Sequence, residues 1–175
     1  MNNPDTQAIR LLSACMMIAA MGVAAAAAAA PPVPIEPDPV LNIPAGDACD
    51  FPLRIENSGS KYHLKEFVDK SGNLVRLLIA GKGSLMTLTN MDPDAYAAIS
   101  LKAYGFSAQI TGFDGTITQT ITGHVLVWML PTDVPAGPST TLYVGRLVYA
   151  TDPGTNVSTI KSFSGKSTDI CAALD

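Results

Sequence analysis

The sequence predicts a single all-β domain of about eight antiparallel strands in a meander, with a barrel favoured over a sandwich. Short segments of alternating apolar and polar residues recur along the chain, and clusters of Gly, Pro, Asn and Asp separate them. Most of these links are short, as expected between neighbouring antiparallel strands. Residues 116–130 become apolar on both sides in their second half, which indicates a barrel or a sheet covered on both faces.

The strands are expected in a regular order along the chain. The first one, FPLRIE, places Phe51, Leu53 and Ile55 on one side, and Pro52 suits an edge strand or a strand start. Turn-forming residues such as DKSGN and DPGTN then separate the later segments. These expected strands cover residues 61–69, 74–80, 84–90, 140–151 and 157–167.

One segment, residues 93–104, fits a helix and a strand about equally well. Asp92 as N-cap, Pro93 at the first helical position and the alanine content favour a helix. The alternation of Ala97, Ile99 and Leu101 with polar residues favours a strand. From these residues alone the choice stays open.

The segment 116–130, TITQTITGHVLVWML, carries the most structural information. Its first half alternates threonines with Ile117, Gln119 and Ile121, so one side is expected to be buried. Its second half is apolar on both sides. Gly123 stands at the change, which predicts a β-bulge or a bend there.

Residues 1–30 have the outline of a secretory signal peptide: a polar start, an uncharged apolar stretch and an alanine-rich end, with cleavage expected near 25–30. Cys15 belongs to a lipobox-like LSAC, but it precedes the apolar stretch that a lipidated cysteine should follow. An uncleaved anchor is disfavoured because few residues of the stretch are strongly apolar. We therefore expect export by the general secretory route to the medium or the cell surface, with no stable membrane insertion after cleavage.

The next segment, residues 31–48, contains six prolines, which exclude a helix or a central strand. It is expected to be an extended linker, and the folded β-domain is expected to cover residues 49–175. Cys49 and Cys171 lie near the two ends of that domain. In an exported chain such a pair predicts a disulfide, which would connect the first strand to the C-terminal segment.

Few residues suggest chemistry. The sequence contains no G-x-S-x-G, H-E-x-x-H, C-x-x-C or Walker motif, so we assign no catalytic residue, metal ligand or cofactor. His63 lies in a polar strand, whereas His124 shares a strand face with Trp128 and could border a ligand pocket. The net charge of −4 weighs against nucleic-acid binding.

Several blocks, taken in order, resemble a family of uncharacterised secreted β-rich proteins of actinobacteria. They are GDACDFPLRIE, DKSGNLVRLLIAGKGSLMTLTN, YVGRLVYATDPGT and SGKSTDICAAL. The most specific is the last one, which is similar to a Thr-Asp-Leu-Cys-Ala-Ala-Leu motif with Ile170 in place of Leu; near the start, Asp50 stands where the family often has Gly. The resemblance implies an exported Gram-positive protein with a Cys49–Cys171 bridge and favours a strand for residues 95–104, but it implies no activity.

Three functions are compatible with these observations. The leading hypothesis is an exported non-enzymatic module that binds an unknown partner or acts at the cell surface. The second is a carrier of a small apolar ligand inside a β-barrel, with His124 and Trp128 near its mouth. The third is an enzyme of the barrel isomerase or cyclase type, which the lack of any catalytic motif disfavours.

Overall fold

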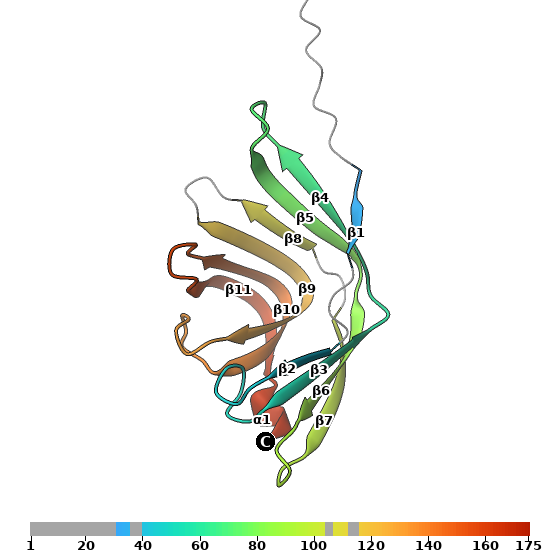
Figure 1. Ribbon diagram of the computed structural model, residues 1–175, viewed down its shortest axis with the longest axis vertical. Helices are drawn as coiled ribbons and strands as arrows, with labels where there is room; N and C mark the ends of the chain where they lie inside the picture. The colour runs from blue at the N-terminus through green and yellow to red at the C-terminus, as the bar shows by residue number, and fades with distance from the viewer. Residues whose placement is uncertain (1–30, 36–39, 104–106, 112–115) are drawn as a thin grey trace, which may run out of the picture.

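The protein folds almost entirely into antiparallel strands, which confirms the all-β prediction. The computed structural model describes residues 31–35, 40–103, 107–111 and 116–175. The expected signal peptide, including Cys15, lies outside the described residues. Within these ranges eleven strands form two sheets, and one short helix, α1 (Cys171–Leu174), follows the last strand (Figure 1).

The larger sheet contains seven strands, and the smaller contains four. In spatial order the larger sheet comprises β1 (Val33–Ile35), β4 (Lys61–Val68), β5 (Leu74–Lys82), β8 (Ser107–Thr111), β9 (Ile117–Met129), β10 (Ser139–Thr151) and β11 (Ser158–Asp169). The smaller comprises β2 (Val40–Ile43), β3 (Leu53–Ser58), β6 (Ser84–Asn90) and β7 (Ala97–Ala103). Neither order returns to its first strand, so the described residues form no closed barrel, and the choice of barrel over sandwich stays a prediction.

All eight expected strands are present, and three more accompany them. Two of the extra strands, β1 and β2, lie in the proline-rich segment and occupy sheet edges. Pro34 pairs opposite His63 at such an edge, where the missing N–H of proline is tolerated. The third extra strand, β8, is only five residues long and has little apolar content, so its sequence gave no clear strand pattern. The prediction of about eight strands was too low by these three.

The ambiguous segment after Asp92 is a strand. Asp92 does initiate a turn, because its Oδ1 accepts a hydrogen bond from the Asp94 amide at 3.0 Å, but strand β7 follows in place of a helix. Ile99 and Leu101 of β7 pack against the core between the sheets, while Ser100 and Lys102 are exposed. β7 pairs with β6 over its full length, and this tertiary pairing favours the strand over the helix.

Two strand pairs pass from one sheet to the other with almost no connecting chain. β3 leads into β4 and β5 into β6, so the two sheets share these continuous ribbons. Figure 1 shows the smaller sheet below the larger one, at the lower end of the molecule. The change of sheet occurs at Gly59 in one ribbon and at Gly83 in the next.

A row of three glycines bends the three longest strands. Gly123 of β9 pairs with Gly145 of β10, which pairs in turn with Gly165 of β11. Their φ angles, 107°, 143° and 132°, lie in the region that favours glycine. The register does not shift at Gly123, so the predicted irregularity there is a bend and not a bulge. The strands curl through this row into an arch (Figure 1).

Because of this bend, the core has two parts. The inter-sheet core lies between the smaller sheet and the outer side of β9 and β10; its buried residues are Ala48, Cys49, Leu53, Ile55, Leu88, Ile170 and Leu174. The concave cluster lies inside the arch and centres on Ile121, Val125 and Leu147. Leu126 packs against the inter-sheet core, whereas its neighbours Val125 and Val127 belong to the concave cluster. This explains why the second half of β9 is apolar on both faces.

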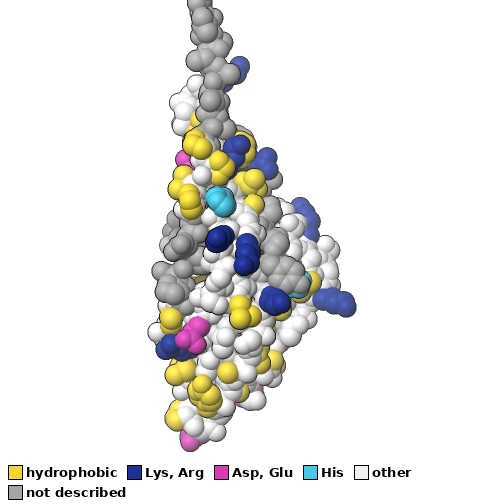
Figure 2. Space-filling model, turned by 90° about the vertical axis from the view of Figure 1, so that its right-hand side faces the viewer, with side chains coloured by type: hydrophobic (Ala, Val, Ile, Leu, Met, Phe, Trp, Pro, Cys, Tyr) yellow, Lys and Arg dark blue, Asp and Glu magenta, His cyan; other side chains and the backbone are white. Residues whose placement is uncertain are grey.

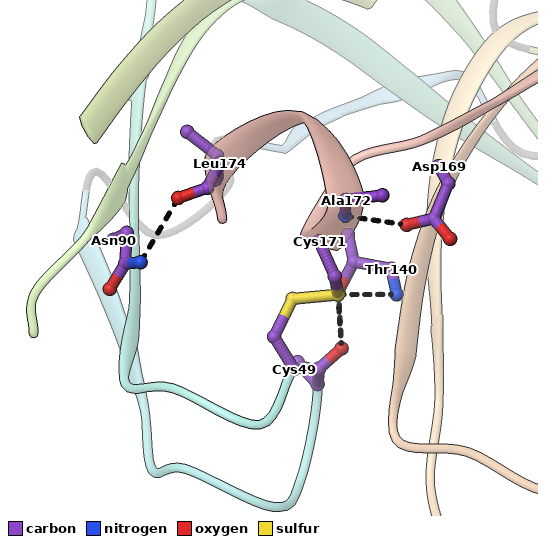
Figure 3. The surroundings of a disulfide bond; sticks show 8 residues. Cys49, Asn90, Thr140, Asp169, Cys171, Ala172 and Leu174 are labelled. Carbon is purple, nitrogen blue, oxygen red and sulfur yellow. Dashed lines mark hydrogen bonds between the residues drawn. A yellow bond between two sulfur atoms is a disulfide. The ribbon is translucent and has the colours of Figure 1, made fainter. Parts of the chain in front are cut away.

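The predicted disulfide is present. Cys49 and Cys171, 122 positions apart, form a bridge with a Cα–Cα distance of 5.5 Å (Figure 3). Buried polar contacts surround it: the Thr140 hydroxyl donates to the carbonyl oxygen of Ala48 at 2.9 Å, and the Asn90 amide donates to that of Leu174 at 3.0 Å. The start of the domain, β6, β10 and helix α1 are therefore fastened at one place.

Replacing both bridge cysteines, as Cys49→Ser with Cys171→Ser, should lower the free energy of unfolding by about 3–5 kcal/mol, because the unfolded chain regains the entropy of a long loop. Urea denaturation of the wild type with and without reductant provides the measurement. The reduced wild type should match the double variant. Equal stability of all three forms would contradict a stabilising bridge.

Replacing Gly145 by Ala should lower the free energy of unfolding by about 3 kcal/mol or more, because the strained φ and a clash act together. A β-carbon at this position would lie 2.1 Å from the carbonyl oxygen of Ser164. Gly72→Ala is the matched control, since its φ of 85° is also positive but nothing lies within 4 Å of the added carbon. That control should lose only about 1 kcal/mol. Equal losses in urea denaturation would show that the bend tolerates side chains.

Candidate functional site

The inside of the arch contains a pocket of about 270 Å³, which we call the hollow. Strand β9 supplies most of its wall, and β10 and the start of β11 supply the rest. The lining residues are Gln119, Ile121, Val125, Leu126, Val127, Trp128, Met129, Tyr149 and Ser158. Its volume is close to the lower end of the range for small-molecule sites, and its lining is mainly apolar, as is typical of such sites.

The apolar wall of the hollow is well packed. Ile121 and Leu147 are almost completely buried, and Met129 is also buried. Farther along the same concave face, the rings of Tyr143 and Phe163 meet edge to face with their centroids 4.7 Å apart, a favourable aromatic geometry. The wall is therefore preformed and does not depend on a ligand to order it.

One hydrogen-bonded pair interrupts this apolar surface. Tyr149 and Gln119 lie directly opposite each other on β10 and β9, and the Tyr149 hydroxyl donates to Gln119 Oε1 at 2.6 Å. Burial raises the pKa of Tyr149, so its hydroxyl stays neutral and keeps donating at physiological pH. The Nε2 group of Gln119 donates to no described residue, which leaves a hydrogen-bond donor beside the hollow for a ligand.

The loop between β9 and β10 is fastened to the edge of β11 beside the hollow. Buried Asp133 accepts two hydrogen bonds of 2.7 Å, one from the amide of Leu130 and one from the amide of Ser158. Val134 adds backbone hydrogen bonds of 2.8 Å to Ser158 and Ile160. These contacts hold Ser158 in the wall. They also hold an exposed apolar rim next to it, where Trp128 is 40% and Val134 52% exposed.

The two residues expected to border a pocket lie in different ones. Trp128 lines the hollow. His124 is half-buried and lines a smaller pocket of about 170 Å³, together with Tyr62 of β4 and with Met86 and Ala103 of the smaller sheet. His63, the other histidine, is exposed on β4. The structure therefore brings Trp128, but not His124, to the candidate site.

Sequence reasoning missed the polar members of the site. Gln119 was visible as the one polar residue between Ile117 and Ile121 on the side expected to be buried, and that was a usable signal. Tyr149 gave no comparable signal, because its contact with Gln119 depends on the pairing of two strands distant in sequence. Asp133, inside a loop flanked by prolines, resembled an ordinary turn residue.

Neither a metal site nor a membrane-spanning helix is present in the part of the chain that the structure covers. Within it, no group of three His, Cys, Asp or Glu side chains is placed to hold a metal ion. Helix α1 is only four residues long, and no helix in the described ranges has the length and apolar character needed to cross a bilayer.

The pH dependence of Tyr149 offers a test of this geometry. Because the folded-state pKa is raised, Tyr149 contributes stability that is complete below the ordinary tyrosine pKa of about 10 and is lost as the pH rises through the folded value. Tyr149→Phe should therefore reduce the loss of stability above about pH 10. Thermal unfolding at a series of pH values, with absorbance titration of the tyrosines, measures both effects. If the phenol that disappears from the titration in the variant is one that ionises near pH 10, Tyr149 is not in a desolvated site.

Comparison with known proteins gives no further assignment. No family model, no curated protein and no solved structure matches this chain. The functional argument therefore rests on the geometry of the hollow and its surroundings.

Proposed function

We propose that the protein is an exported, non-enzymatic binding module, and that its hollow binds a small apolar molecule carrying one hydrogen-bond acceptor such as a carbonyl oxygen. The single observation that supports this most is the composition of the hollow. Its wall is apolar except for the Gln119–Tyr149 pair and Ser158, and Gln119 Nε2 donates to none of the residues that the structure describes. An apolar wall supplies affinity, and one placed donor supplies orientation.

Binding is favoured over catalysis by the state of the polar groups. Tyr149 has a raised pKa, so it is a poor general base near neutral pH. His124, the other candidate base, lines a separate pocket. An isomerase or cyclase would need a base directed at the ligand in the hollow, and neither side chain meets that description. Chemical conversion of a bound probe would revive this alternative.

If the protein is a carrier, the curved sheet forms the wall that holds the ligand. The arch of β9, β10 and β11 has the curvature of a barrel wall, and the glycine row provides it. A ligand in the hollow would contact this wall on one side only, so the exposed rim at Trp128 and Val134 would cover part of it. The alternative to a carrier is a cell-surface protein that binds no small ligand.

Export is supported by two independent features. The Cys49–Cys171 disulfide is typical of oxidising compartments outside the cytoplasm. The first thirty residues have the pattern of a cleavable signal peptide. The resemblance to secreted actinobacterial β-proteins agrees with both and extends the proposal to a Gram-positive cell envelope.

The proposal can be tested through Trp128, which is the only tryptophan of the chain and lines the hollow. Titration with 2-nonanone should change its fluorescence in a saturable way, and nonane should bind more weakly because it cannot accept a hydrogen bond from Gln119. Gln119→Leu should remove this preference for the ketone, with a loss of about tenfold in affinity for it.

Thr122→Leu provides the matched control, because Thr122 lies on β9 like Gln119 but is exposed on the outer face of the strand. It should bind both probes like the wild type. A fluorescence response that does not saturate, or one that Thr122→Leu changes as strongly as Gln119→Leu, would contradict binding in the hollow.

A further inference from the structure

The outer face of the β4–β5 ribbon concentrates positive charge on a protein whose net charge is −4. The pairing register places Lys65, Arg76, Lys61 and Lys82 on this one face. Lys102 is exposed on β7 of the smaller sheet, opposite Leu85 of β6, the strand that follows β5. Figure 2, which views the molecule from the right-hand side of Figure 1, shows Lys and Arg side chains gathered over the middle of the surface. Few acidic side chains appear among them in that view.

These cations are not equivalent. Lys65 and Arg76 lie over the ring of Phe67, at 5.3 and 5.2 Å from its centroid, so the ring engages both. Lys61 and Lys82 are exposed and lie directly opposite each other on neighbouring strands. Like charges in that position destabilise a sheet.

No acidic side chain of the described residues forms an ion pair that would relieve this repulsion. Among the described residues, the salt bridge of the structure joins Arg54 to Glu56 at 2.9 Å. It involves none of Lys61, Lys82 and Lys102. Lys61, Lys82 and Lys102 therefore form a cationic group without a protein counter-ion in the part of the chain that is described. Such a group is suited to an external anion.

A pocket of about 370 Å³, which we call the bend pocket, lies beside two of these lysines. It lies where the ribbons pass from one sheet to the other, and its lining is Ser58, Gly59, Lys82, Gly83, Ser84, Leu85 and Lys102. Cross-strand pairing jumps here from Ser58 opposite Leu85 to Lys61 opposite Lys82. The register therefore assigns no cross-strand partner to Gly59, Ser60 or Gly83.

Ser84 adds an independent sign of an unfilled polar site. This residue is only 3% exposed, and its hydroxyl has no hydrogen-bond partner among the described residues. Native proteins rarely leave a buried hydroxyl unsatisfied, so such a group calls for an explanation. Ser84 lines the bend pocket, and its side chain lies with that of Ala103 on the buried face of the smaller sheet.

We propose that the bend pocket binds a phosphate group that belongs to a larger molecule. Lys82 of β5 and Lys102 of β7 both line the pocket, and two positive charges suit a phosphate monoester, which carries nearly two negative charges, better than a carboxylate, the usual partner of an arginine fork. Lysine acts at such sites as a point charge for phosphate. The pocket exceeds the size of a free phosphate ion, and exposed Leu85 offers an apolar contact for the rest of the ligand.

The test uses the disulfide-bonded protein and glycerol phosphate, a small soluble phosphate monoester, followed by amide chemical shifts in NMR. The amides of Gly83, Ser84 and Leu85 should shift in a saturable way. The double variant Lys82→Gln with Lys102→Gln should weaken binding at least about tenfold. Ser84→Ala should weaken it to a smaller degree.

Lys70→Gln is the matched control, because Lys70 lies in the exposed turn at the opposite end of the ribbon. It removes one positive charge, as each of the two substitutions in the double variant does, and should leave the affinity unchanged. Acetate at equal ionic strength should give no saturable shift. Equal weakening by Lys70→Gln, saturation by acetate with the same affinity, or the absence of any saturable shift would each overturn the proposal.

A further experiment, with lipid vesicles, distinguishes two sources of the phosphate group. Vesicles of phosphatidylglycerol that retain the wild-type protein, and release it when glycerol phosphate is added, would support a lipid headgroup. Binding of glycerol phosphate without retention by vesicles would support a soluble or polymeric phosphate ester. The hollow lies on the concave face of the sheet, so loss of ketone binding there and loss of phosphate binding here are distinguishable results.

Discussion

The bend of the larger sheet at the row of Gly123, Gly145 and Gly165 is the constraint on which the rest of the structure depends. A β-carbon at Gly145 or at Gly165 would lie 2.1 Å from a carbonyl oxygen of the neighbouring strand, so the close approach of the backbones requires glycine. Because the strands curl there, one face becomes concave and the other becomes a platform for the smaller sheet. The two parts of the core and the hollow all follow from this one backbone feature.

A second feature fixes how the two sheets meet. The hydroxyl of Thr140 is fully buried and bonds to the backbone of Ala48, and buried Asn90 bonds to the last turn of α1 (Figure 3). Each bond satisfies a backbone carbonyl that would otherwise lose its hydration without compensation. Apolar packing alone would permit the smaller sheet several positions. These polar contacts select one of them, beside the disulfide.

Much of the fold follows from local sequence pattern, and the site largely does not. Alternation located strands such as the one that buries Leu53 and Ile55, and Gly123 marked the bend. Its alignment with Gly145 and Gly165 could not be predicted, because it depends on the register of strands far apart in sequence. The same limit separated His124 from Trp128: strand alternation puts them on one face, but different neighbouring strands border each residue.

The position of the disulfide also has a mechanical consequence. Cys49 follows the edge strands β1 and β2, and Cys171 begins the final helix. A force that pulls the proline-rich segment away from the C-terminus is therefore carried by a covalent bond across the base of the domain. Strands β3 to β11 lie within the bridged loop and are shielded from that load. Only the short pairings of β1 and β2 would peel, so the domain would yield by a small, reversible extension while the hollow and the bend pocket keep their shape.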